Sequence, residues 1–177
     1  MTIGQKMLGE FDQEMENTRK TLERIPEDKW NWKPHEKSGS VGWLAGHIAT
    51  MPGWAGLTIK TEHYDYAPVD VPGVQAPKIE NKKGLLAEFD KNVAESRAAL
   101  AGVSDQEILK DWTLLGGGKT VFKMPRVARI RSMVMNHLIH HRGQLLVYYR
   151  LLGIPVPGLY GPSADEGQLG SGAAAGN

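Results

Sequence analysis

The chain contains no cysteine among its 177 residues. Disulfides, thiolate metal ligands and a cysteine nucleophile are therefore excluded together, and imidazole and carboxylate remain as the strong metal ligands. The chain also lacks any apolar run near the roughly 18 to 20 residues that a bilayer-spanning helix needs. Residues 1–13 carry acidic side chains where a secretory signal would be basic and then apolar. We expect a cytoplasmic protein that neither spans nor binds a membrane.

The chain also lacks a large excess of charge of one sign. Charged residues make up 23% of it, but the formal net charge is only +1. Such a chain has no overall field to attract nucleic acid or an acidic membrane surface, so we expect neither as a partner. Its length and 41% hydrophobic content suffice for one buried core but not for two ordinary domains. We expect one domain over residues 1–166 and a loose, glycine- and alanine-rich tail over 167–177.

Four segments carry apolar residues at three- and four-residue intervals, which predicts four helices. We expect these helices over residues 3–25, 40–54, 85–100 and 126–152. Pro26 closes the first helix, and Pro52 should kink or end the second. Ser40 is the expected N-cap of the second helix, and Pro125 fits the first turn of the fourth. The pattern of the fourth continues without interruption to its end.

Two stretches between these helices have no helical period. Residues 62–78 contain three prolines and form a connection. At about 3.3 Å per residue this connection can run the length of a helix of about 20 residues, so it permits the second and third helices to be parallel. Residues 112–115 and 120–123 flank three glycines and predict a short hairpin before the fourth helix. The predicted fold class is all-α, a helical bundle with one long crossover.

Three histidines fall on helical stripes that should face the core. At about 100° per residue and with His137 at zero, the apolar side chains of the last helix lie between about 20° and 80°. His141 lies near 40°, inside this arc, whereas His140 lies near about −60°, at its edge. In the second helix, His47 shares a stripe with Leu44. The sequence therefore predicts that His47, His137 and His141 point inward.

A shared metal ion explains these three inward histidines. Two imidazoles one turn apart can bind one ion, and a third from a facing helix completes a set of three nitrogens, the arrangement of catalytic zinc sites with an open position. The alternative is three ordinary buried histidines with separate hydrogen-bond partners. We favour the metal, because burying several imidazoles without partners is costly and one ion satisfies them together. His47, His137 and His141 are the predicted metal ligands.

Other polar and aromatic residues carry weaker signals. No residue is predicted as general base, since His63, His140 and Tyr160 are each expected to be surface or packing residues. Trp43 and Trp54 share the stripe of His47, and we expect them to pack in the core. Five basic residues crowd the start of the last helix, and we interpret them as a solvated rim, with an anionic substrate or partner as the alternative: Lys119, Lys123, Arg126, Arg129 and Arg131.

The histidine-rich run NHLIHHRGQL at 136–145, with residues 149–153 and the segment PGLYGPSADE at 157–166, resembles the C-terminal signature of the DinB/YfiT-like metal-dependent proteins. The segment SVGWLAGHI at 40–48 is similar to the second-helix segment of that family. The resemblance covers residues 3–166. It implies a four-helix bundle with up-down-down-up topology that forms a homodimer. It also implies a bound divalent metal ion, with zinc or nickel favoured, whose ligands fall here on His47, His137 and His141.

The same resemblance implies a metal-dependent enzyme acting on a small molecule. Relatives of this kind include enzymes that add a low-molecular-weight thiol to electrophiles and others proposed as hydrolases, and we favour thiol transfer. Arg142 and Gln144 belong to the signature, which places them beside the site or at an interface without a catalytic role. Two alternatives stay open: a non-catalytic, metal-binding or stress-associated bundle that the ion stabilises, and a metal-free interaction module. A fourth protein ligand would favour a structural ion.

Overall fold

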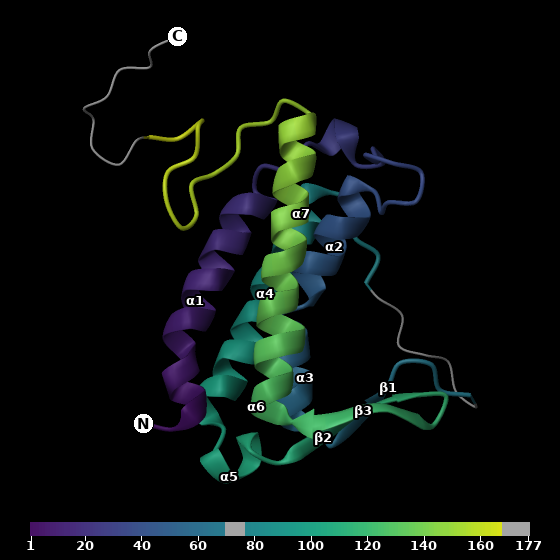
Figure 1. The fold of residues 1–177 in the computed structure, drawn as a ribbon, viewed down its shortest axis with the longest axis vertical. Coiled ribbons are helices and arrows are strands. Elements are labelled where there is room, and N and C mark those ends of the chain that lie inside the picture. The colour runs from purple at the N-terminus through teal and green to yellow at the C-terminus, as the bar shows by residue number, and fades with distance from the viewer. Residues whose placement is uncertain (70–76, 168–177) are drawn as a thin grey trace.

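Helical columns form the body of the protein in the computed structural model, which describes residues 1–69 and 77–167 (Figure 1). The columns are α1 (Ile3–Leu22), α2 (Val41–Thr50) continued by α3 (Gly53–Lys60), α4 (Lys82–Gly102), and α6 (Arg126–Arg129) continued by η2 (Ile130–Asn136) and α7 (His137–Leu151). Short helices η1 (Glu27–Lys29) and α5 (Asp105–Ile108) join them. In Figure 1, α1 and the α6–α7 column run upward, whereas α2, α3 and α4 run downward.

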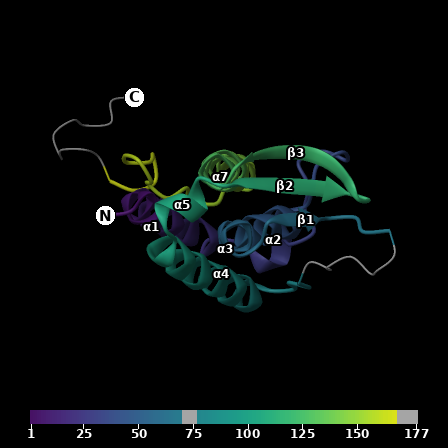
Figure 2. The ribbon, with the colours of Figure 1, turned by 90° about the horizontal axis from the view of Figure 1, so that it is seen from below.

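A three-stranded sheet lies across one end of the helices, so the prediction of an all-α four-helix bundle is wrong, and the fold is mixed. Strands β2 (Asp111–Gly116) and β3 (Lys119–Pro125) form the expected antiparallel hairpin. Strand β1 (His63–Asp65) pairs in parallel with β2, with His63 opposite Thr113. We did not predict β1 from the sequence, because a strand of three residues is too short to show an alternating pattern of apolar and polar side chains. Its pairing with β2 is made by backbone groups, which leave no trace in the sequence. Seen from below, the sheet extends away from the helices beside α7 (Figure 2).

The helix boundaries follow local signals that the sequence carries. The hydroxyl of Ser40 accepts a hydrogen bond from the backbone N–H of Trp43 at 3.1 Å, which confirms the predicted N-cap. Pro52 separates α2 from α3, as expected. Asn81 caps α4 in the same way, through the N–H of Gly84 at 2.8 Å. The Ser40 cap fixes where α2 begins, and hence where His47 lies along the column.

The last column is not a uniform α-helix, because η2 is π-helical. The uninterrupted helix predicted over residues 126–152 is therefore wrong at this point. A π-turn is closed by a backbone hydrogen bond between residues i and i+5 and is wider than an α-turn. The rotation of 100° per residue therefore does not hold across it. Buried side chains are accordingly five apart, at Arg129 and Val134 and at Ile130 and Met135. Such segments are frequent at functional sites, and this one ends directly before His137.

The hydrophobic core lies where the helical columns face one another. Contacts join α4 to α1, α2 and α3, and α7 to α1 and α2. The centre consists of apolar side chains that are at most 1% exposed, among them Phe11, Ile48, Phe89, Leu145 and Tyr149. No helix among the described residues is long and apolar enough to cross a membrane. The predicted tail lies, apart from Gly167, outside the described residues.

Candidate metal centre

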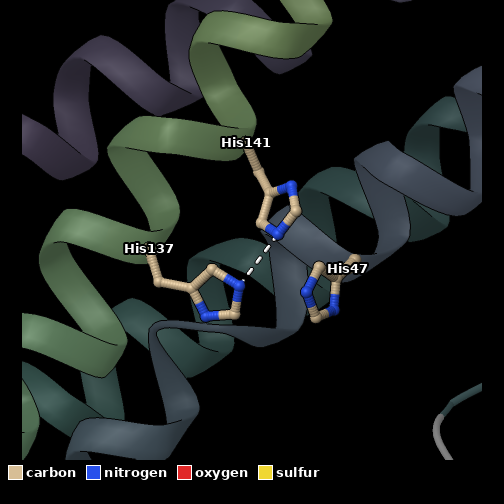
Figure 3. A group of neighbouring side chains, drawn as sticks. All are labelled: His47, His137 and His141. Atoms are coloured by element: carbon tan, nitrogen blue, oxygen red, sulfur yellow. Dashed lines mark hydrogen bonds between the residues drawn. The ribbon is translucent and has the colours of Figure 1, made fainter.

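Three imidazoles from two helical columns point toward one another: His47 of α2, and His137 and His141 of α7 (Figure 3). One ring nitrogen from each lies within 4.8 Å of the other two. The Nε2 atoms of His137 and His141 are 2.8 Å apart, and the ring centre of His47 lies 4.9 Å from that of His141. The structure thus brings the three predicted ligands together. That they bind a metal stays a prediction.

Gln144 orients His141. Its Oε1 lies 2.7 Å from Nδ1 of His141, one turn earlier on α7. An amide oxygen accepts only, so Nδ1 carries the proton and Nε2 presents its lone pair to the cluster. Nδ1 of His137 is enclosed, and the Met133 backbone is near this ring without forming a well-aligned hydrogen bond, so the contact of the ring with His141 is made through Nε2. Gln144 therefore lies beside the site, as expected.

The protonation state of the cluster suits a metal ion. Burial lowers the pKa of His47 to about 4, and repulsion from His141 and His137 contributes. Burial and then His141 also lower the pKa of His137, against an opposing interaction with the Met133 backbone. Both rings are therefore neutral at pH 7, which is the form of imidazole that binds metals. No carboxylate joins this cluster within the described part of the chain, so the ligand set carries no negative charge.

The spacing of the three nitrogens fits a divalent cation. Zinc–nitrogen bonds of about 2.0 to 2.1 Å place the nitrogens of a tetrahedral site about 3.3 Å apart. The Nε2 atoms of His137 and His141 are closer than this, at 2.8 Å, and no pair in the cluster exceeds 4.8 Å. Every pair is therefore within about 1.5 Å of the required separation. A tetrahedral ion held by these three nitrogens would have one position left for a small molecule, because no fourth ligand joins the cluster within the described chain.

Tryptophans and a cavity surround His47. Its ring stacks on Trp43, with centres 5.3 Å apart and planes 18° from parallel, and meets the ring of Trp54 at 5.6 Å. Trp43 is 59% exposed, so the prediction that it packs in the core is wrong. A cavity of about 330 Å³ lies beside His47 and is also lined by Trp30, Trp43 and Ile79. Its volume is that of a small-molecule site.

Most of the other polar residues considered from the sequence lie away from the cluster. Tyr160 donates a hydrogen bond to Glu14 at 2.7 Å and contacts Arg142. Arg142 itself, expected beside the site or at an interface, is buried in an ion pair with Glu14 at 2.7 Å. His63 belongs to β1. The exposed His140 does adjoin the cluster, with its ring centre 5.0 Å from that of His141.

Two of the five basic residues near the start of the last column are buried, so the interpretation as a solvated rim is wrong for them. Arg126 is 4% exposed and pairs with Glu107 at 2.8 Å. Arg129 is 6% exposed and packs against Trp112 and Trp54, 4.6 and 5.9 Å from their ring centres. Sequence reasoning missed both, because their burial depends on residues distant in the sequence, Glu107 for Arg126 and Trp54 and Trp112 for Arg129.

Comparison with known proteins gives a consistent family and fold. The sequence model of the DinB family matches residues 1–173. The uncharacterized protein YrdA of Bacillus subtilis (strain 168) is 24% identical over 162 residues, which cover 90% of this chain and 89% of YrdA. A DinB-like protein from Bacillus cereus ATCC 10987 shares the fold with a TM-score of 0.64 at 24% identity, over 87% of this chain and 95% of its own. The DinB-like protein YjoA from Bacillus subtilis shares the fold with a TM-score of 0.62 at 21% identity, over 85% of this chain and 95% of its own.

Proposed function

This chain belongs to the DinB family, and we propose that it is a metal-dependent enzyme that transfers a low-molecular-weight thiol to a small electrophile. The observation that carries the proposal is the convergence of three imidazole nitrogens within 4.8 Å, with no fourth ligand from the described chain. Three protein ligands and an open position are typical of catalytic rather than structural sites. We propose zinc or nickel as the ion, because both accept imidazole nitrogen.

The chain's own residues prepare this site for an anionic ligand. His47, His137 and His141 would hold the cation, and Gln144 keeps the lone pair of His141 directed at it. When bound, such an ion supplies positive charge that deprotonates a coordinated thiol or water and polarises a carbonyl. Because the ligand set is neutral, that charge is not reduced by the protein. The cavity beside His47 gives the second substrate a place to bind.

Hydrolysis is the second activity that the same ligand set supports. A cation with three nitrogen ligands and an open position suits activation of water as well as of a thiol. What favours thiol transfer is the family resemblance of the run 136–145 and of the segment 157–166, because relatives of this fold include enzymes that use a low-molecular-weight thiol. A non-catalytic site, in which the ion only stabilises the fold, is the third reading, and it predicts metal-dependent stability without turnover.

The test uses untagged protein loaded with zinc or nickel and assayed for conjugation of glutathione, bacillithiol and mycothiol to a standard electrophile. We expect conjugation with at least one thiol, its loss on chelation, and its loss in His137→Ala. The matched control is His140→Ala, which removes a neighbouring imidazole outside the cluster and should retain activity. Failure with all three thiols removes thiol transfer, and metal-dependent cleavage of a model ester by the same samples would then favour hydrolysis.

A further inference from the structure

Arg129, the last residue of α6, lies in a cage of three aromatic side chains next to the histidine cluster. Its guanidinium carbon is 4.6 Å from the ring centre of Trp112, 5.9 Å from that of Trp54 and 6.0 Å from that of Phe122. Cation–π contacts of this kind stabilise the positive charge. They do not provide acceptors for the N–H groups at the edge of the guanidinium.

The N–H groups of Arg129 lack the partners that a buried cation normally has. Nε and Nη1 are enclosed and form no hydrogen bond with any described residue. Burial lowers the pKa of Arg129 to about 10, which leaves it charged at pH 7. Enclosing a charge without a partner is costly, and proteins rarely retain one without a reason. The position therefore has the properties of a site that is completed by an external acceptor.

The other buried arginines of this column show the contrast. Arg126 has the carboxylate of Glu107 at 2.8 Å, and Arg142 has that of Glu14 at 2.7 Å. Each of these two guanidiniums is thus neutralised within the chain. In contrast, Nε and Nη1 of Arg129 form no hydrogen bond with a carboxylate of any residue that the structure describes.

Arg129 and the histidine cluster contact the same indole. The ring of Trp54 lies 5.8 Å from that of His137 and 5.6 Å from that of His47, and it also faces the guanidinium. The charge of Arg129 reaches His137, where it helps to lower the pKa of the ring. Trp54 thus packs against the guanidinium and against the rings of His47 and His137.

We propose that Arg129 binds a carboxylate, or a similar planar oxyanion, of the substrate whose reacting group lies at the histidine cluster. The guanidinium fork matches two carboxylate oxygens in a way that an ammonium does not. The oxyanion supplies the acceptors that Nε and Nη1 lack. This inference rests on the proposed function and narrows its substrate to an anionic small molecule.

The test measures binding of glutarate and of its neutral analogue glutaramide by calorimetry and by tryptophan fluorescence, with metal-free and metal-loaded protein. We expect glutarate to bind at least about tenfold more tightly than glutaramide, since only the carboxylate satisfies the guanidinium. Arg129→Met should lose this preference, and Arg129→Lys, which keeps the charge without the fork, should retain part of it. Arg131→Gln, an exposed arginine on the same column, should bind glutarate like the wild type.

The outcomes separate this inference from the proposed function. Equal binding of glutarate and glutaramide by the wild type, or an unchanged preference in Arg129→Met, overturns the role of Arg129 while leaving metal binding intact. Metal content is measured on every sample, so absence of metal from the wild type overturns the proposed function by itself. If Arg129→Met does not fold, Arg129→Lys decides, because an affinity equal to that of the wild type would contradict recognition by the guanidinium fork.

Discussion

Arg142 and Arg129 lie on the same helical column, and both are buried, but their surroundings differ. Arg142 is 1% exposed and donates hydrogen bonds to Glu14 at 2.7 Å, to Thr18 at 3.0 Å and to Tyr160. Arg129 lies among aromatic rings, and its Nε and Nη1 form no hydrogen bond with any described residue. The guanidinium of Arg142 finds its polar partners within the chain and helps to hold the fold together. That of Arg129 leaves polar groups unsatisfied, as expected of a binding site.

The largest expected effect is at Arg142. Arg142→Met leaves the carboxylate of Glu14 buried without its partner, and we expect the free energy of unfolding to fall by about 3 to 5 kcal/mol. Urea unfolding measures this. The control is Arg150→Met, which removes an exposed ion pair with Asp165 and should cost at most about 1 kcal/mol. Equal effects of the two substitutions would break the comparison.

The next effect concerns the hydrogen bond that orients His141. Gln144→Ala should weaken metal binding by about 10- to 100-fold, because the ring loses the partner that fixes its tautomer. Its effect on the unfolding of metal-free protein should stay within about 0.5 kcal/mol, since Gln144 is exposed. Gln106→Ala, at another exposed glutamine, is the control. The measurement is a metal titration of both variants. An affinity of Gln144→Ala for metal equal to that of the wild type would show that the amide does not support the site.

A smaller effect follows from the histidine pKa values in metal-free protein. The pKa of His47 is about 4 when folded and 6.5 when unfolded, so between these values the unfolded chain binds more protons. Stability is therefore fully present above pH 6.5 and falls as the pH is lowered toward 4. The lowered pKa of His137 acts in the same direction. Urea unfolding at several pH values should show a shallower slope for His47→Gln, and an identical slope would contradict this.

The smallest effect is expected at the other arginine. Arg129→Met should leave the free energy of unfolding of metal-free protein within about 1 kcal/mol of the wild type, because loss of the cation–π contacts is offset by removal of a buried, unpaired charge. The measurement is the same urea unfolding used for Arg142→Met, which makes the two variants directly comparable. A loss of 3 kcal/mol or more would place Arg129 among the residues that hold the fold.

Sequence reasoning located the histidines and Gln144 but not the burial of the nearby arginines, and the reason is physical. His137 and His141 lie one turn apart inside α7, so their common face follows from helix geometry alone. Ser40 and Pro52 fix the position of His47 through local signals of the same kind.

Features that depend on distant contacts could not be predicted. The burial of Arg129 requires the packing of Trp112, whose strand was predicted but whose contact with the last helical column was not, and the π-turn, which has no periodic signal. The ion pair of Arg142 requires Glu14, 128 residues earlier. The three-residue β1 has too little sequence to be recognised, and its pairing with β2 turns the predicted hairpin into a three-stranded sheet.

Metal content tests the central claim most directly. Untagged protein is exhaustively chelated and then titrated with zinc and with nickel, and the bound metal is counted per chain. The account predicts one ion per chain for the wild type and for His140→Ala, and at least about a hundredfold weaker binding for His137→Ala, since a lost ligand costs more than a lost supporting residue. A wild-type chain that binds neither ion, or a His137→Ala variant that binds as the wild type does, would contradict it.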